Sequence, residues 1–191
     1  MTDDEIAEIL GPSFNRVAMD GSLALRELGL APGAKVLDVG TGRGRSAIFL
    51  ASRGFDVVTG EPSTDTTHYA GHDWEDGARK VGLRDKIRFQ AFDASDMPFS
   101  DGAFDAVVYF GVLHHVDAES RGAVFAESVR VLKSGGAVVF FEPRREHLEK
   151  MWVNDPGHPE AADPSLYASG HAVTETRIAG SAMDIVIFRR A

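Results

Sequence analysis

The stretch VLDVGTGRG, residues 36–44, decides the fold expected for this chain. It begins with three apolar β-formers around one carboxylate, Asp38. Three glycines then follow at every second position, Gly40, Gly42 and Gly44. The pattern predicts a short buried strand that ends in a tight turn, followed by a helix from about Arg43 to Arg53. The free backbone amides at the start of that helix would face a ligand held at the turn.

Two common nucleotide-binding motifs do not fit this turn. The dinucleotide fingerprint requires a third glycine three residues after its second, and Arg45 occupies that position. No Gly-Lys-Ser/Thr follows, so the turn is not a phosphate-binding P-loop. Asp38 would repel a pyrophosphate, but it suits a ligand that carries an ammonium group. A structural turn with an Asp helix cap is the alternative that this stretch alone leaves open.

Composition excludes several classes of protein. A length of 191 residues predicts one domain, and the absence of cysteine excludes disulfides, thiolate nucleophiles and cysteine metal sites. The acidic N-terminus lacks the pattern of a signal peptide, and no apolar run approaches the ~20 residues of a membrane span. We therefore expect a cytoplasmic protein with no membrane partner. The net charge of −9 argues against a nucleic-acid partner.

A second acid follows at the distance that a parallel βαβ unit predicts. Residues 55–60 are expected to form a strand that runs into Glu61, 21 residues after Gly40. An acid at about that distance commonly binds a ribose. Its carboxylate can accept from both ribose hydroxyls through charge-assisted bonds worth ~1.5–3 kcal/mol each. The alternative is an exposed loop acid.

Periodicity predicts the remaining elements. Helices are expected at residues 3–10, 13–29, 66–82 and 117–132, and strands at 86–92, 104–110, 137–141, 172–178 and 182–189. The run at 104–110 is apolar throughout, which is typical of a central parallel strand buried on both faces. His68 and His72 would share a face of the 66–82 helix at metal-ligand spacing. Because no third ligand is in view, no metal site is expected.

Five segments in this order resemble the class I S-adenosylmethionine-dependent methyltransferases, of the methyltransferase domain 11/25 kind. The glycine-rich turn resembles their motif I, Asp-x-Gly-x-Gly-x-Gly, and Glu61 stands where many of them have an acid. DASDMPF at 93–99 resembles their Asp-Ala-x-x-Leu-Pro-Phe segment, and VLHHV at 112–116 is a close match. KSGG at 133–136 has Ser134 where the family usually has a proline. The resemblance covers about residues 36–141.

The resemblance implies an α/β fold, a Rossmann-like three-layer sandwich. Its seven-stranded, mostly parallel sheet would have the order 3-2-1-4-5-7-6 and an antiparallel C-terminal strand. The single domain would comprise lead-in helices (1–30), a cofactor-binding core (31–142), a substrate lid (143–171) and a terminal hairpin (172–191). The implied cofactor is S-adenosyl-L-methionine, which leaves as S-adenosyl-L-homocysteine. Its implied binding residues are Asp38, Gly40, Thr41, Gly42, Gly44, Glu61, Asp93, Ala94 and Phe110. Asp93 would accept from the adenine amino group, and Ala94 would donate a backbone N–H to the ring.

Methyl transfer to a small-molecule acceptor is the function that the resemblance implies. Candidate general bases lie where the fourth strand ends, at His114, His115 and Tyr109. The histidine pair could instead only shape the turn. Two other functions remain open, a non-catalytic module that binds the adenosyl cofactor and a nicotinamide-dependent oxidoreductase. Arg45 and Asp38 disfavour the oxidoreductase.

Acceptor choice is expected to depend on the segment 143–171. A long irregular stretch in a compact domain is usually functional or disordered, and its aromatic and imidazole content argues against disorder. We predict a short helix at 144–152 and a lid that orders over the acceptor. The pocket-lining candidates are Trp152, His147, His158 and Tyr167. A surface strap or a dimer contact is the alternative, in a protein that is a monomer or a homodimer.

Overall fold

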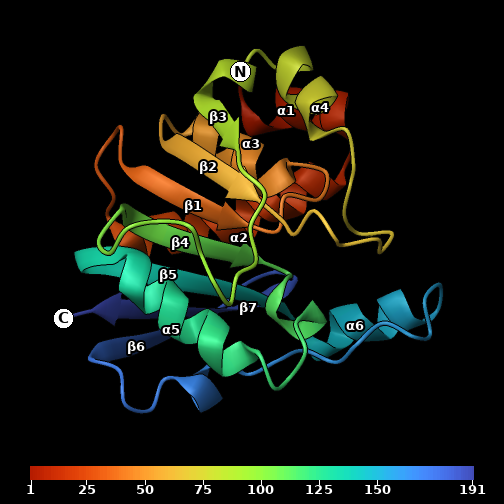
Figure 1. Cartoon of the computed structure of the whole chain (residues 1–191). Helices are drawn as coiled ribbons and strands as arrows, with labels where there is room; N and C mark the ends of the chain where they lie inside the picture. Colours follow the sequence, from red (N-terminus) through yellow and green to blue (C-terminus); the bar gives the residue numbers. More distant parts are fainter.

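A seven-stranded sheet in the order β3-β2-β1-β4-β5-β7-β6 forms the centre of the computed structural model, which describes residues 1–191 (Figure 1). The strands are β1 (Lys35–Val39), β2 (Asp56–Gly60), β3 (Ile87–Phe89), β4 (Phe104–Phe110), β5 (Leu132–Pro143), β6 (Val173–Ala179) and β7 (Met183–Arg190). β1 to β5 are parallel to one another, and β7 runs antiparallel between β5 and β6. The predicted fold class and strand order are confirmed.

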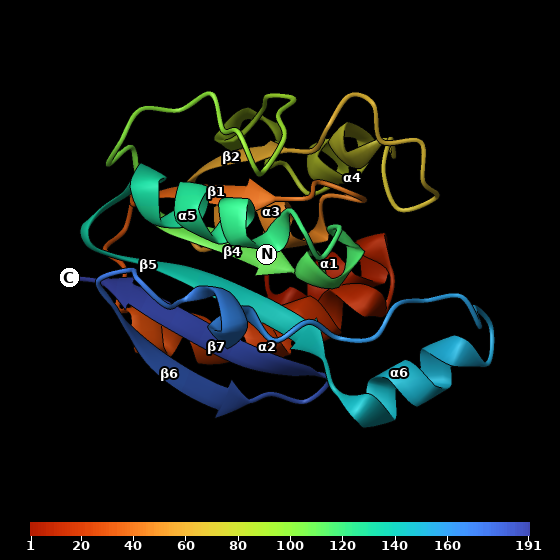
Figure 2. The ribbon, with the colours of Figure 1, turned by 60° about the horizontal axis from the view of Figure 1, so that its bottom comes forward.

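Helices cover both faces of the sheet. They are α1 (Asp3–Leu10), α2 (Ser13–Leu28), α3 (Arg45–Ser52), α4 (Trp74–Lys80), α5 (Arg121–Val131) and α6 (Arg145–Trp152), with 3-10 turns η1 (Arg84–Lys86), η2 (Leu113–His115) and η3 (Pro164–Tyr167). In Figure 1, α5 lies in front of the sheet and α2 lies behind it. Figure 2 shows α6 projecting beyond the end of the sheet toward which the parallel strands run. No helix is both long and apolar enough to cross a membrane.

The central strands separate two apolar cores. Val36 of β1 packs with buried residues of α1 to α4 in one core, and Leu37 and Val39 pack with buried residues of α5 in the other. The strand order reverses between β1 and β4, which both belong to the buried middle of the sheet. In open α/β sheets, ligands bind in the crevice outside the carboxyl ends of the strands at such a reversal. The fold therefore predicts where the site should be.

The expected helix at 66–82 was wrong for its first half. Only Trp74–Lys80 is helical, and residues 62–73, here called the covering loop, are irregular. Gly71 has a left-handed φ of 69°, and the Asp73 side chain accepts from the Asp76 N–H, so the helix is capped at its present start. Two strand boundaries differ from the expected ones by three residues or more: β3 ends at Phe89, and β5 begins at Leu132.

One buried carboxylate fastens the terminal hairpin to the rest of the fold. Asp20 of α2 is fully buried, and it accepts hydrogen bonds from the backbone N–H groups of Ser181, Ala182 and Met183 at 2.6, 3.1 and 3.0 Å. These amides belong to the β6–β7 turn and the start of β7. Hydrogen bonds to a charged acceptor contribute ~1.5–3 kcal/mol each. Asp20 thus holds the hairpin in the register that completes the sheet.

Candidate functional site

A cavity of about 520 Å³ lies at the carboxyl ends of β1, β2 and β4. It collects predicted cofactor-binding residues from several separate segments, Gly40, Gly42, Glu61, Asp93, Ala94 and Phe110. Its volume falls within the ~300–1,000 Å³ typical of small-molecule and cofactor sites. Asp38, Thr41 and Gly44 do not line it. The position agrees with the one that the strand reversal predicts.

The glycine-rich turn needs its glycines for conformation and for space. Gly40, Gly42 and Gly44 have left-handed φ values of 84°, 45° and 71°. A Cβ on Gly40 would lie 2.6 Å from a methyl carbon of Val112, so a larger residue could not occupy that position without displacing Val112. The Gly40 N–H donates to the Gly60 carbonyl at 2.8 Å, which joins the ends of β1 and β2. The backbone is therefore open to close approach by a ligand.

Glu61 is tied to two backbone amides at the cavity wall. Its Oε2 accepts from the Gly42 N–H and its Oε1 accepts from the Gly71 N–H, each at 2.8 Å. One carboxylate thus links the glycine turn to the covering loop. Each oxygen has a second lone pair that can accept another hydrogen bond. Glu61 is half-buried at the cavity and is not an acid on an exposed loop.

Asp38 lies beneath the glycine turn. It is 1 % exposed, its Oδ2 accepts from the Thr59 hydroxyl at 2.7 Å, and its Oδ1 has no hydrogen-bond partner. Burial raises the pKa of Asp38 to about 6, although the hydroxyls of Ser46 and Thr59 partly counter this effect. Thr41 supports the same arrangement, since its hydroxyl lies 3.0 Å from that of Thr59. Asp38 can therefore influence a ligand through its electric field, but its side chain does not reach the cavity wall.

Asp93 presents an ionised carboxylate at the wall of the cavity. Its Oδ1 accepts from both the backbone N–H and the hydroxyl of Ser95, at 2.8 and 2.7 Å. These hydrogen bonds lower its pKa. Because both bonds use Oδ1, Oδ2 is left for a donor in the cavity.

A second cavity of about 240 Å³ adjoins the first. Tyr69, Phe110, Gly111 and His115 line both cavities. Residues 153–172, here called the connector, lead from α6 to β6. Of the residues predicted to line an acceptor pocket, His147 of α6 and His158 of the connector do line this cavity, and Trp152 and Tyr167 do not. Trp152 instead donates to the His158 carbonyl at 2.7 Å, and Tyr167 packs against the core beside α5.

The structure separates the three candidate bases. Tyr109 is fully buried, its hydroxyl lies 2.7 Å from Ser128 Oγ in α5, and it lines neither cavity. Burial also raises its pKa, so we leave Tyr109 out of the proposed site. His114 and His115 lie on η2 and both line the second cavity. Partial desolvation at the cavity wall, together with neighbouring His114 and His158, lowers the pKa of His115 to about 4 even though its surface is exposed, which makes it a weak base at neutral pH.

Two residues that sequence reasoning missed organise this cavity. Glu142, at the end of β5, is buried, and its Oε2 lies 2.9 Å from His114 Nδ1. Tyr69 of the covering loop donates to Asp155 at 2.6 Å, and its ring lies 4.4 Å from that of His115. Glu142 could have been predicted from the sequence, because it stands at the end of an expected parallel strand, as Glu61 does. Tyr69 was missed because it was assigned to the helix expected at 66–82, whereas it lies in the irregular covering loop.

Comparison with known proteins agrees with this architecture. Residues 37–140 match the family model for a methyltransferase domain. A demethylmenaquinone methyltransferase of Beutenbergia cavernae is 33% identical over 142 residues, which cover 74% of this chain and 52% of that protein. A sterol 24-C-methyltransferase of Gibberella zeae is 37% identical over 133 residues, 69% of this chain and 34% of that protein. The chain thus spans between a third and about half of these two relatives.

A solved structure extends the agreement to the whole fold. The geranyl diphosphate C-methyltransferase of Streptomyces coelicolor A3(2), crystallised with S-adenosyl-L-homocysteine, superimposes with a TM-score of 0.65 at 18% identity. The match covers 89% of this chain and 74% of that one. The fold and its cavity at the strand reversal define a class I, Rossmann-like domain. The chain belongs to the methyltransferase domain family.

Proposed function

We propose that this chain is an S-adenosyl-L-methionine-dependent methyltransferase that acts on a small-molecule acceptor. One observation carries the proposal, namely the 520 Å³ cavity that gathers the glycine turn, Glu61, Asp93 and Phe110 at the strand reversal. The glycine turn is open to close approach, and the carboxylates of Glu61 and Asp93 follow along the cavity. This arrangement suits an elongated ligand with a ribose in its middle. The same cavity is lined by no lysine or arginine side chain that could neutralise a pyrophosphate.

The lining residues suggest how the cofactor lies. Glu61 would accept from the ribose hydroxyls, and Asp93 Oδ2 and the Ala94 backbone would bind the adenine. The amino-acid end would lie against the turn at Gly40, where the missing Cβ permits close approach. The buried Asp38 carboxylate beneath that turn would favour the ammonium group electrostatically.

The 240 Å³ cavity is the proposed acceptor site. It meets the cofactor cavity at Phe110, Gly111 and His115, so an acceptor there would lie beside the transferred methyl group. Its volume is below the ~300 Å³ at which typical ligand pockets begin, which favours a small acceptor or one part of a larger one. The bound cofactor supplies a methyl group already activated by its sulfonium. The chain mainly has to position the acceptor, a contribution of ~7–11 kcal/mol.

Calorimetry tests the cofactor assignment. S-adenosyl-L-methionine and S-adenosyl-L-homocysteine should bind with dissociation constants of micromolar order, about −8 kcal/mol, whereas NAD and ATP should give no measurable heat. NAD binding of similar strength would overturn the assignment in favour of an oxidoreductase. The control is Gly40→Val, in which a side chain would collide with Val112 and close the turn. This variant should lose adenosyl binding.

Transfer from methyl-labelled S-adenosyl-L-methionine into a metabolite extract tests turnover. A labelled small molecule, identified by mass spectrometry, would support the proposal and name the acceptor. Tight cofactor binding without transfer to any extract would instead favour a non-catalytic adenosyl-binding module. Deleting residues 154–168 separates the two roles further. If the connector forms the acceptor site, the deletion should abolish transfer while cofactor binding remains.

A further inference from the structure

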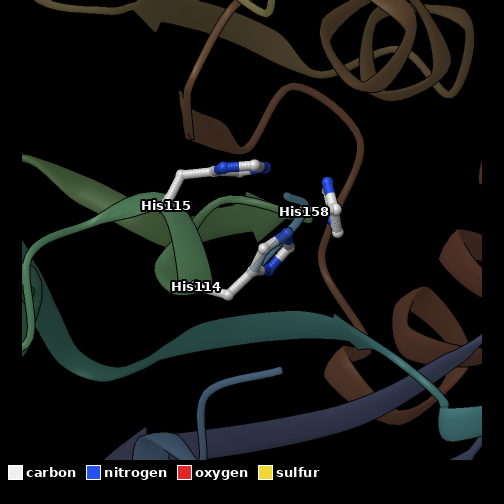
Figure 3. Close-up of side chains that lie close together, drawn as sticks. All are labelled: His114, His115 and His158. Atoms are coloured by element: carbon white, nitrogen blue, oxygen red, sulfur yellow. The ribbon is translucent and has the colours of Figure 1, made fainter. Parts of the chain in front are cut away.

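Three histidines from two separate segments meet at the second cavity. His114 and His115 come from η2, and His158 comes from the connector (Figure 3). Their ring centroids are 4.2 to 5.2 Å apart, and one ring nitrogen of each lies within 4.8 Å of the other two. Figure 3 shows the three rings converging on a common space. All three side chains line the 240 Å³ cavity.

The hydrogen bond of His114 fixes which of its nitrogens is free. Its Nδ1 lies 2.9 Å from Glu142 Oε2, and that oxygen also accepts from the Ala162 N–H at 2.8 Å. A carboxylate oxygen that receives these bonds accepts, so His114 Nδ1 carries the proton and donates. Its Nε2 then presents a lone pair. A carboxylate behind a histidine is the usual second partner of a metal-binding imidazole.

Hydrogen bonds through Tyr69 fix His158 in the same tautomer, with the proton on Nδ1. The Tyr69 hydroxyl donates to Asp155 Oδ2 at 2.6 Å and lies 2.9 Å from His158 Nδ1. Because the hydroxyl proton is already used, Tyr69 can only accept from His158, whose Nδ1 must therefore carry a proton. The other nitrogen, Nε2, is buried and has no hydrogen-bond partner. The side chain of His158 is only 2% exposed, so this bare lone pair is costly unless something binds it.

The bare nitrogen of His158 distinguishes this cluster from a structural turn. A histidine pair that merely shapes the turn would account for His114 and His115. It would not account for a buried, unpartnered nitrogen on a third ring beside them.

We propose that His114, His115 and His158 bind one divalent transition-metal ion of the zinc class, with an open coordination position toward the 240 Å³ cavity. Three imidazoles and no carboxylate oxygen suit zinc and its neighbours, whereas magnesium and calcium prefer oxygen ligands. Metal–nitrogen distances of ~2.0–2.1 Å in a tetrahedron place the nitrogens about 3.3 Å apart. The nitrogens now lie up to 4.8 Å apart, so they need to approach by about 1.5 Å at most, which rotation of the three side chains together with movement of the connector would supply.

The open position lies where the proposed acceptor would bind. An acceptor hydroxyl or thiol coordinated there loses its proton to solvent more readily, because the ion stabilises the resulting anion. The anion then forms the new bond to the methyl carbon, and the carbon–sulfur bond breaks with its electron pair remaining on sulfur. This role rests on the proposed function, but the metal site does not.

Metal titration of tag-free, chelator-stripped protein tests the site. Zn²⁺ measured by calorimetry and Co²⁺ measured by visible absorption should each bind at one ion per chain, and Co²⁺ should give the intense bands of a four-coordinate site. His114→Ala and His158→Ala should each weaken binding about 100-fold, which is the upper range for disrupting a metal site's supporting contacts. His72→Ala is the matched control, since His72 is a half-buried histidine outside the cluster that contacts the His68 carbonyl. It should bind as the wild type does.

Three results would overturn the site. They are folded wild-type protein that binds neither ion at about 1 mM, binding in His158→Ala equal to wild type, and binding heat that persists when His114 and His158 are both replaced by alanine. Long-range NMR of the histidine rings gives a reading that needs no variant, because Zn²⁺ should shift Nε2 of His114 and His158 and leave their Nδ1 protons in place. S-adenosyl-L-homocysteine affinity is measured on the same sample. Failure of cofactor binding and failure of metal binding are thereby distinguished.

Discussion

Asp38→Asn is the most informative single substitution, because it separates the stability of the domain from its function. Asp38 is 1 % exposed, and burial is the largest cause that raises its pKa from 3.8 to about 6. Asparagine is nearly isosteric and keeps an oxygen that can accept from the Thr59 hydroxyl. It removes the buried charge. We expect the variant to be more stable than the wild type at alkaline pH and to bind the cofactor less tightly.

The magnitude follows from the difference between the two pKa values. Between about pH 4 and pH 6 the folded state holds a proton that the unfolded state has released. The free energy of unfolding contributed by Asp38 is therefore highest below pH 4, and it falls as the pH rises through 6. A shift of about two pKa units corresponds to ~3 kcal/mol at 1.36 kcal/mol per unit. The uncharged amide has no such dependence.

Urea unfolding at several pH values measures the effect. The stability of Asp38→Asn minus that of wild type should rise by about 3 kcal/mol between about pH 4 and pH 8. Asp56→Asn is the control, because Asp56 is exposed on the neighbouring strand, and its difference from wild type should stay flat. A difference for Asp38→Asn that does not change with pH would refute the reasoning. It would mean that Asp38 is solvated or already paired.

Three further outcomes are expected. Glu61→Ala should weaken S-adenosyl-L-homocysteine binding at least about tenfold in calorimetry, because two charge-assisted bonds are lost, and an unchanged dissociation constant would place Glu61 outside the site. Asp20→Ala should lower the free energy of unfolding by about 3 kcal/mol in urea, since three backbone amides lose their acceptor. The exposed Asp184→Ala should change it little. Tyr109→Phe should cost about 1 kcal/mol and leave methyl transfer unchanged, whereas a large loss of turnover would return Tyr109 to the catalytic candidates.

The fold was predictable because its signals are local and ordered. Buried strands such as β4 are continuous apolar runs, and the glycine turn identifies β1, from which the order of the other segments follows. The helix expected at 66–82 failed because its first half has no apolar stripe. The left-handed Gly71 and the Asp73 cap were the physical signals that the helix begins at Trp74.

The site was predictable only as far as strand geometry reaches. Parallel strands bring their carboxyl ends to one edge, so Glu61 and Asp93 could be placed at one cavity. The side of the sheet on which Asp38 lies was also predictable from the alternation of side chains along a strand. Every second residue faces the same side, and Val36 packs in the core that includes α3. The convergence of His158 on η2 depends on the path of an irregular connector. No periodicity in the sequence encodes that path.

The hydrogen bonds of Tyr69 predict how fast ligands can enter the two cavities. Its hydroxyl bonds to Asp155 and His158 of the connector, while the Gly71 amide of the same covering loop bonds to Glu61. The covering loop is thus tied both to the connector and to Glu61, and we expect its opening to ease the entry of ligands to both cavities. The observed rate of cofactor association should therefore level off at high cofactor concentration, at the rate of loop opening.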